Sequence, residues 1–303
     1  MSACNDLTIV IPVKNEREGL KLVLEEILEA GFNTESILVV DGGSTDGTKE
    51  VAKSYGAMVV TQRYPGGKAG GVRTGLELAR TSYVVILDGD YTYPPVHIWD
   101  LCRKLDEGYD MVIGVRRPQP GAMGLIFRLG NKMLTTWFNL IFGTRLRDVL
   151  SGMYAIKVEA LKEAMWETGG FSVESEVVAH IASTTGRIAE VDIAYRSRVG
   201  EKKLKPIHGV KIFTDMIRLS LSYNPVFTMF AVTSLILIPG VALDLYYIYH
   251  LLLNDVKYYL KGLLGAVMTV VGLQTLSMAI LTLYMKRMEF RLRRAVEKAL
   301  RSR

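Results

Sequence analysis

The chain has 303 residues, close to the size at which a single hydrophobic core divides into domains, and its formal net charge is +6. Its hydrophobic fraction of 49% excludes an intrinsically disordered protein, and its 28 glycines and 9 prolines follow no period that would indicate a collagen-like chain. The two cysteines, Cys4 and Cys102, are too few for the disulfide framework of a secreted domain, and we expect both to be free thiols.

Short runs rich in Val, Ile and Leu alternate with segments of helical periodicity in the N-terminal part of the chain. The expected strands are Leu7–Val13, Ser36–Asp41, Ala57–Thr61, Tyr83–Asp88 and Met111–Val115. The expected helices are Glu16–Ala30, Ser44–Tyr55 with Ser44 as its N-cap, Gly71–Arg80 and Pro95–Glu107. This alternation predicts an α/β domain with a parallel sheet and helices on both faces. Ligands of such sheets bind beyond the carboxyl ends of the strands.

Polar side chains follow these strands where a ligand is expected. Asp88-Gly89-Asp90 comes at the end of the fourth strand, and its two carboxylates are hard oxygen ligands that suit Mg²⁺ or Mn²⁺. An isolated Asp-Gly-Asp also occurs in ordinary turns. Arg116 and Arg117 follow the fifth strand, however, and a metal ion together with a guanidinium would suit a diphosphate.

Two later segments have the spacing of amphipathic helices. In Leu125–Phe142 a 4-3-4 spacing separates the polar residues Arg128, Lys132, Thr135 and Asn139. In Ile207–Tyr223 the same spacing separates Lys211, Asp215, Arg218 and Ser222. Helices of this kind either lie in the headgroup plane of a membrane or pack on a protein core, and the pattern leaves both open.

Two uncharged stretches near the C-terminus are long enough to span a bilayer. Val226–Leu243 and Gly262–Met285 contain 18 and 24 residues without a charge, and about 20 apolar residues cross a membrane as a helix. We expect two spans, over about residues 226–250 and 261–285, joined as a hairpin. The alternative is a pair of buried core helices.

Basic residues flank this hairpin. Residues 1–200 carry a net charge of −3 and residues 201–303 carry +9, but the only basic residues between the uncharged stretches Val226–Leu243 and Gly262–Met285 are Lys257 and Lys261. The positive-inside rule therefore places both termini and the N-terminal domain in the cytoplasm, as a multi-pass membrane protein. The charge suits anionic membrane lipids rather than nucleic acid. The expected segments are a catalytic domain over 1–204, an interfacial helix over 205–225, a transmembrane hairpin over 226–285 and a basic cytoplasmic tail over 286–303.

Seven motifs follow one another along the chain. They are VIPVKNE, VVDGGSTDGT, GGKAGGVRTGL, ILDGDYTYPP, IGVRR, RDVLSGMYAIK and RSRVGEKKL. In this order they resemble the family 2 glycosyltransferases, and within them the dolichol-phosphate mannose synthase group. The resemblance implies a Rossmann-like GT-A fold with Mg²⁺ or Mn²⁺ as cofactor. It also implies inverting transfer of a hexose from a GDP- or UDP-sugar to a polyprenyl or dolichyl phosphate, which makes a lipid-linked sugar for glycan assembly such as protein glycosylation.

The resemblance also implies roles for individual residues. Those implied for the donor are Pro12, Lys14, Glu16, Val40, Asp41, Lys68, Asp88, Gly89, Asp90 and Arg116. Those implied for the metal are Asp88 and Asp90, with Thr92 where relatives often have Gln. Those implied for the acceptor and its phosphate are Asp148, Ser151, Glu174, Glu176, Arg198, Lys202 and Lys203. Asp90, Arg116 and Asp148 are the residues implied in catalysis.

The chain departs from the family pattern at two further positions. The family usually has two acids where this chain has Asp41-Gly42, so the nucleoside stays open. The segment from Arg198 to the lysine is one residue shorter in this chain than in the family, so the phosphate ligand is either Lys202 or Lys203. The sugar stays open between mannose, glucose and an N-acetylhexosamine.

Two other functions are compatible with the pattern. One is a glycosyltransferase that acts on another lipid or on a polysaccharide; no QxxRW motif, typical of processive synthases, occurs in the sequence. The other is a membrane-anchored nucleotide-binding protein without catalysis, against which the intact Asp-Gly-Asp motif argues. The sequence does not indicate an oligomeric state.

Overall fold

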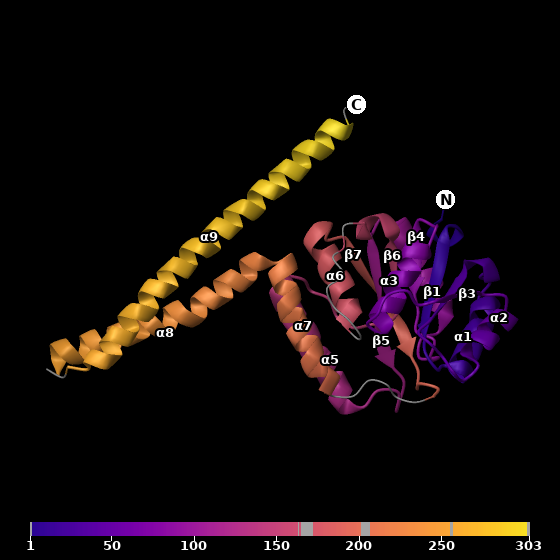
Figure 1. Cartoon of the computed structure of the whole chain (residues 1–303), viewed down its shortest axis with the longest axis horizontal. Helices are drawn as coiled ribbons and strands as arrows, with labels where there is room; N and C mark the ends of the chain where they lie inside the picture. The colour runs from indigo at the N-terminus through magenta and orange to yellow at the C-terminus, as the bar shows by residue number, and fades with distance from the viewer. Residues whose placement is uncertain (1, 163, 165–171, 201–206, 255–256, 302–303) are drawn as a thin grey trace. The chain divides into compact units, whose positions relative to one another are not determined.

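The structure is a computed structural model that describes residues 2–162, 164, 172–200, 207–254 and 257–301. The chain divides into two compact units, Met1–Leu219 and Ser220–Arg303. The first unit is an α/β domain and the second consists of long helices (Figure 1).

In the described part of the first unit, seven strands form one sheet in the order β3-β2-β1-β4-β6-β5-β7. They are β1 (Leu7–Val13), β2 (Ile37–Asp41), β3 (Met58–Thr61), β4 (Tyr83–Ile86), β5 (Met111–Pro118), β6 (Tyr154–Lys157) and β7 (Ile188–Tyr195). β6 runs antiparallel to β4 and β5, and the other neighbouring pairs are parallel. The winding direction reverses between β1 and β4, and ligands of open α/β sheets bind beyond the carboxyl ends at such a switch point.

Helices cover both faces of this sheet (Figure 1). The α-helices described before residue 225 are α1 (Arg17–Glu29), α2 (Thr48–Ser54), α3 (Lys68–Leu78), α4 (Ile98–Asp106), α5 (Leu125–Phe142), α6 (Val173–Thr184) and α7 (Ile207–Tyr223). Short 3-10 turns precede or follow several of them: η1 (Ala3–Asn5), η2 (Thr34–Ser36), η3 (Pro95–His97) and η4 (Val158–Leu161).

The alternating side chains of β1 divide the core between the two faces. Ile9 and Ile11 are buried in a cluster that includes Leu24 of α1. Val10 faces the other side, where α3 approaches so closely that a Cβ on Gly75 would lie 2.2 Å from Val10 Cγ1. Each face of the strand thus packs on its own helix layer, as expected for a strand whose side chains point alternately to opposite faces.

The predicted α/β fold is confirmed, with two local corrections. The five strands that were predicted all run in the same direction, but the sheet is mixed rather than parallel, because the additional strand β6 inserts between β4 and β5 in the opposite direction. The second helix begins at Thr48 rather than beside Ser44, and its N-cap is Gly47 with a φ of +90°. The Ser44 hydroxyl instead accepts a hydrogen bond from the Asn15 N–H at 2.9 Å, which joins the loops after β1 and β2.

The amphipathic segments form helices with the predicted bounds. α5 covers Leu125–Phe142 and ends at Gly143, whose φ of +66° is the left-handed conformation in which helices commonly stop. α7 covers Ile207–Tyr223, and it contacts α5 through the Trp137 and Phe213 rings, whose centres are 5.2 Å apart.

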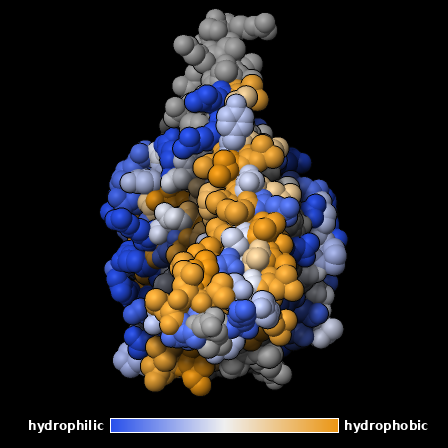
Figure 2. Space-filling model, turned by 90° about the vertical axis from the view of Figure 1, so that its left-hand side faces the viewer, coloured by the Kyte–Doolittle hydropathy of each residue, from blue (hydrophilic) through white to orange (hydrophobic). Residues whose placement is uncertain are grey.

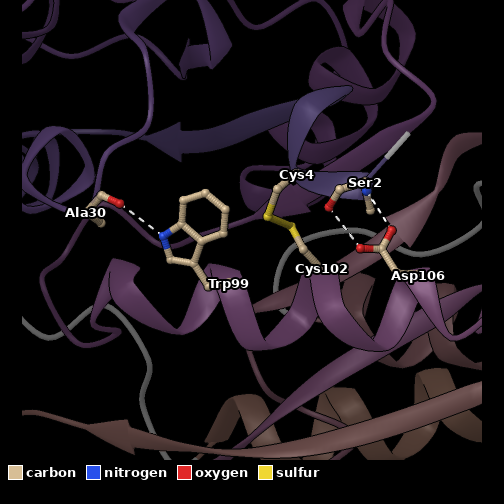
Figure 3. The surroundings of a disulfide bond; sticks show 7 residues. Ser2, Cys4, Ala30, Trp99, Cys102 and Asp106 are labelled. Carbon is tan, nitrogen blue, oxygen red and sulfur yellow. Dashed lines mark hydrogen bonds between the residues drawn. A yellow bond between two sulfur atoms is a disulfide. The ribbon is translucent and has the colours of Figure 1, made fainter.

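The prediction of free thiols is wrong, because Cys4 and Cys102 form a disulfide (Figure 3). Cys4 lies in η1, before β1, and Cys102 lies in α4. Ser2 and Ala3 reinforce the same junction through hydrogen bonds of 2.9 and 2.7 Å to the Asp106 carboxylate. The bond ties the N-terminal segment to α4 at the edge of the sheet opposite to the carboxyl ends of the strands.

We expect Cys4→Ala to lower the free energy of unfolding by about 4–5 kcal/mol. The disulfide closes a loop of 98 residues, and a loop of that length confers a stabilisation of this size in the chain-entropy model. Urea unfolding of the wild type and the variant, each with and without dithiothreitol, measures the effect. Dithiothreitol should destabilise the wild type alone. Equal stability of the two proteins without reductant would contradict the prediction.

The second unit contains α8 (Pro225–Leu253) and α9 (Tyr259–Arg301). The two helices pack through glycines. A Cβ on Gly240 would lie 2.8 Å from the Thr269 backbone nitrogen, and one on Gly265 would lie 2.4 Å from Asp244 Oδ1. The Thr269 hydroxyl donates to Asp244 Oδ2 at 2.6 Å. Small residues and interhelical hydrogen bonds of this kind are typical of helix pairs in membranes.

α8 and the Tyr259–Met288 part of α9 are long and apolar enough to cross a membrane. Only 11% and 17% of their most apolar windows are buried, whereas core helices would be mostly buried. Hydrophobic side chains also cover much of the face shown in Figure 2. Near the turn between the helices, Lys261 Nζ lies 4.6 and 4.4 Å from the ring centres of Tyr246 and Tyr258, a composition typical of a membrane interface.

Candidate active site

A cavity of about 740 Å³ lies at the carboxyl ends of β1 and β4. One wall is polar and is made mainly by residues that follow the strands: Lys14, Glu16, Lys68, Asp88, Asp90, Arg116, Glu174 and Arg198. The other wall is mainly apolar and comes largely from α5 and α7: Met123, Ile126, Phe127, Met133, Leu134, Val210 and Ile212. The cavity therefore suits a ligand that has both a charged and a hydrocarbon part.

Close packing fixes the Asp88-Gly89-Asp90 turn against β1 and α1. A Cβ on Gly89 would lie 2.6 Å from Val13 Cγ1, and a Cβ on Gly19 would lie 2.8 Å from the Gly89 carbonyl oxygen. Thr92 holds the second carboxylate, because its N–H and its hydroxyl donate to Asp90 Oδ1 at 3.1 and 2.5 Å. The small residue between the two aspartates is thus a packing requirement of the turn.

Each carboxylate of this turn is paired with a cation that also binds a second acid. Lys68 Nζ lies 2.5 Å from Asp88 Oδ1 and 2.5 Å from Glu174 Oε1. Arg198 donates to Asp90 Oδ2 at 2.9 Å and also to Glu16. Four carboxylates and two cations leave this cluster with a formal charge of −2.

Burial and charge shift the pKa values within the cluster. Burial, together with the neighbouring Asp88, raises the pKa of Asp90. Burial likewise raises the pKa of Glu174, although Lys68 opposes it. Burial alone would lower the pKa of Lys68, but Asp88 and Glu174 outweigh it and keep that pKa well above its usual value. Lys68 therefore stays charged at neutral pH.

Gly152 lies in the loop before β6, and because it has no side chain there is room beside it for the ion pair of Lys68 and Asp88. A Cβ at this position would lie 2.2 Å from Asp88 Oδ2 and 2.9 Å from Lys68 Nζ. The Gly152 N–H donates to the Tyr93 hydroxyl at 2.8 Å, which holds the loop in place.

We expect Gly152→Ala to lower kcat/KM by about 10²-fold, because a displacement of about 1 Å at a reacting centre costs that much. The added methyl group should also destabilise the fold by about 1–3 kcal/mol, as other overpacked sites do. Steady-state kinetics and thermal unfolding of the same preparation measure both effects. Wild-type kinetics in the variant would show that the contact between Lys68 and Asp88 is dispensable.

Arg116, near the end of β5, is clamped by two other residues. Its Nε and Nη2 donate to the two oxygens of Asp148, each at 2.7 Å, and Nη2 also donates to Asn131 Oδ1 at 2.8 Å. Asn131 Nδ2 in turn donates to Asp148 Oδ1 at 2.9 Å. Burial would raise the pKa of Asp148, but Arg116 and the hydrogen bonds lower it. Among the described residues Nη1 of Arg116 has no hydrogen-bond partner, and Arg116 is one of the residues that line the cavity.

The structure brings most of the residues predicted for the donor together around the cavity. Pro12, Lys14, Glu16, Lys68, Asp88, Gly89, Asp90 and Arg116 line it, as do Glu174 and Arg198 from the acceptor set. Val40, Asp41, Thr92, Asp148, Ser151 and Glu176 are buried and are not among its lining residues. Lys202 and Lys203 lie outside the described residues.

The fully buried Asp41 holds its own loop. Its carboxylate accepts hydrogen bonds from the N–H groups of Gly43 at 2.9 Å and Ser44 at 3.1 Å, and Lys49 Nζ lies 3.2 Å away. Burial would raise the pKa of Asp41, but these hydrogen bonds lower it. Its contact with a nucleoside stays a prediction.

Asn131 and Tyr195 were missed by the sequence reasoning, although both line the cavity. Asn131 lies on α5 but outside the 4-3-4 polar spacing, so the pattern gave no reason to select it. The Tyr195 ring lies 5.6 Å from the Arg116 guanidinium and 5.2 Å from the Tyr93 ring. Tyr195 ends β7, a strand that was not predicted.

The carboxylates at the cavity fit a divalent cation that is shared with a ligand. Among the described residues, no three His, Cys, Asp or Glu side chains are grouped as a metal cage. Mg²⁺ needs only one or two carboxylates when phosphate oxygens and water complete its shell. Asp88 and Asp90 would provide these carboxylates, and a divalent cation would cancel the formal charge of −2. The Thr92 hydroxyl is engaged with Asp90, and its role as a metal ligand stays a prediction.

Comparisons with known proteins agree on one family. Residues 8–163 match the family model of glycosyl transferase family 2. Glycosyltransferase AglJ of Haloferax volcanii is 33% identical over 280 residues, which cover 90% of this chain and 91% of that protein. The dolichyl-phosphate hexose transferase of the same organism is 32% identical over 206 residues, covering 68% of this chain and 89% of that protein.

A solved structure supports the fold. The glucosyl-3-phosphoglycerate synthase from Mycobacterium tuberculosis, in complex with Mn²⁺, UDP-glucose and phosphoglyceric acid, has a TM-score of 0.58 and 22% identity to this chain. The match covers 71% of this chain and 79% of that one. At 22% identity, this structural similarity supports the GT-A fold alone.

Proposed function

The chain belongs to glycosyl transferase family 2, and from this premise we propose that it transfers a hexose from a nucleoside diphosphate sugar to a polyprenyl phosphate at a membrane. The observation that carries the proposal is the two-sided cavity, whose charged wall continues into an apolar wall made by α5 and α7. The name of one relative, dolichyl-phosphate hexose transferase, supports the same acceptor class.

The charged wall suits the donor diphosphate. Arg116 lines the cavity, Asp148 and Asn131 hold its Nε and Nη2, and Nη1 would donate to the phosphate oxygens. Mg²⁺ or Mn²⁺, held by Asp88 and Asp90, would neutralise the charge that develops on the departing diphosphate. Lys68 stays charged between Asp88 and Glu174, at a point where sugar hydroxyls and phosphate oxygens would meet.

The acceptor needs orientation more than activation. A phosphate monoester has a second pKa of about 6, so it is largely dianionic at neutral pH. One of its oxygens attacks the anomeric carbon, the bond to the β-phosphate oxygen breaks, and the nucleoside diphosphate leaves with the electron pair. Attack from the opposite face inverts the anomeric centre. Asp148 is fully engaged with Arg116, so we assign it to positioning rather than to proton transfer.

The apolar wall suits the hydrocarbon part of the acceptor. Within α5, Leu125, Ile126, Leu129 and Met133 are 59–71% exposed, and the helix contains Arg128 and Lys132 but no acid. An exposed apolar helix with basic residues is typical of a membrane interface. We infer that α5 and α7 lie in the headgroup region, that α8 and α9 form a two-span hairpin, and that the catalytic domain and both termini are cytoplasmic.

The choice of acceptor tests this function directly. The full chain in vesicles with Mn²⁺ is given one of three acceptors: a polyprenyl phosphate, the matching polyprenol, or 3-phosphoglycerate. Each is combined with a panel of GDP- and UDP-hexoses. We expect transfer only to polyprenyl phosphate, because polyprenol lacks the anion and phosphoglycerate lacks the hydrocarbon. Equal or faster transfer to either of the other two would overturn the proposal.

Removing residues 226–303 tests the role of the hairpin. We expect the truncated chain to bind nucleoside diphosphate as the full chain does, because the residues of the charged wall all precede residue 226. Transfer to a long-chain acceptor in vesicles should fall by about tenfold or more, because the catalytic domain loses its high local concentration at the membrane. Isothermal titration and vesicle assays measure the two properties. Full activity on vesicles without the hairpin would contradict the anchoring role.

A further inference from the structure

Asn131 stands at the boundary between the two walls of the cavity. It lies on α5, the helix that supplies much of the apolar wall, and it lines the cavity itself. Side chains three and four residues apart share a helix face. Phe127 and Leu134 therefore lie beside Asn131 on its face of α5, and both line the apolar part of the cavity.

Both the oxygen and the nitrogen of the Asn131 amide are hydrogen-bonded to the Arg116–Asp148 pair. Its Oδ1 accepts from Arg116 Nη2 at 2.8 Å, and its Nδ2 donates to Asp148 Oδ1 at 2.9 Å. Arg116 and Asp148 have side-chain exposures of only 12% and 4%, so these hydrogen bonds are shielded from water. Asn131 thus connects the apolar helix directly to a guanidinium that lines the cavity.

We propose that Asn131 is a positioning residue that couples the seating of the acceptor hydrocarbon on α5 to the orientation of Arg116. The inference rests on the proposed function. Hydrocarbon packed against Phe127 and Leu134 restrains α5, and α5 restrains the Asn131 amide. The amide fixes Nη2 of Arg116, so that Nη1 stays directed at the reacting phosphates. A longer hydrocarbon chain should therefore raise kcat as well as lower KM.

The test compares acceptors of different chain length in the wild type and in Asn131→Leu. Leucine has the same branched arrangement of heavy atoms as asparagine, with two larger methyl groups in place of the amide oxygen and nitrogen, and cannot make either hydrogen bond. Short and long polyprenyl phosphates are presented to the full chain in detergent micelles of one composition, at saturating donor and Mn²⁺. In the wild type, kcat should rise and KM should fall with chain length. In the variant, KM should still fall, but kcat should lose its dependence on chain length and drop by about tenfold for the long acceptor.

Thr136→Ala is the matched control, because Thr136 is exposed on the same helix and its hydroxyl bonds only to the Lys132 carbonyl oxygen. It should keep the wild-type dependence of kcat on chain length. Thermal unfolding of all three proteins shows whether the fold is kept.

Three results would overturn the inference. If Asn131→Leu lowers kcat by the same factor for short and long acceptors, the residue is merely structural. If the wild-type kcat does not depend on chain length, no coupling exists. Both results leave the proposed function intact. If the wild type uses no polyprenyl phosphate of either length, the proposed function fails and this inference fails with it.

Discussion

Asp90→Asn is expected to lower kcat/KM for hexose transfer by about 10²–10³-fold, the size of effect seen when a group that stabilises transition-state charge is removed. Asp90 follows β4, one of the two strands at the switch point of the sheet. Its carboxylate accepts a hydrogen bond from Arg198 at 2.9 Å and would hold the metal ion together with Asp88. Asparagine keeps the shape of the side chain and its contact with Thr92, but it removes the negative charge.

The measurement is transfer at saturating Mn²⁺ together with thermal unfolding. The variant should stay folded, because the substitution changes no packing volume in this 8% exposed residue. Asp100→Asn is the matched control, since Asp100 is a partly exposed acid on α4 that pairs with Arg103. Near-wild-type transfer by Asp90→Asn at saturating metal would show that this carboxylate does not serve the reaction.

Arg116→Lys is expected to lower kcat/KM by about 10²-fold. Arg116 grips Asp148 with two parallel hydrogen bonds and still has Nη1 for a phosphate, whereas an ammonium group cannot do both. The substitution removes one of the two hydrogen bonds to Asp148 and the hydrogen bond that Nη1 would make to a phosphate. Each charge-assisted hydrogen bond is worth about 1.5–3 kcal/mol. Because Asp148 is buried, the variant should also unfold at a lower temperature.

Arg117 provides the control at the neighbouring position. It is 60% exposed in its side chain and pairs with Asp192 at the surface at 2.8 Å. Arg117→Lys should therefore leave transfer and unfolding nearly unchanged, since exposed ion pairs contribute little. Steady-state kinetics of both variants test the assignment. Equal losses in the two variants would show that the guanidinium of Arg116 has no special role.

The strands and helices with strong local signals were predictable. β1 and β2 are mostly apolar runs, interrupted only by Thr8 in β1 and ended by Asp41 in β2. α5 begins after Gly124 and ends at Gly143, which favours a helix end. β6 and β7 were not predicted. Their pairing partners lie far away in the chain, and no local signal shows that β6 inserts antiparallel between β4 and β5.

The site was predictable where its residues follow strands. Glu16, Asp88, Asp90 and Arg116 meet because the strands before them end at one edge of the sheet. The pairing of Lys68 with Glu174 could not be predicted, since it depends on the position of α6 relative to α3. Asn131 lay outside the polar spacing of α5.

The disulfide was missed for a related reason. Two cysteines 98 residues apart carry no signal of proximity, and the argument from cysteine number concerned frameworks of several bridges. The bond depends on where η1 meets α4, which is a property of the assembled fold.

The most direct test of the central claim is the mass spectrum of the lipid recovered from vesicles that contain the full chain, polyprenyl phosphate, Mn²⁺ and a mixture of UDP- and GDP-hexoses. We predict a polyprenyl phosphate that carries one hexose, formed with the wild type and absent with Asp90→Asn. Recovery of unmodified polyprenyl phosphate while the wild type releases free hexose, or passes it to another lipid, would contradict the claim.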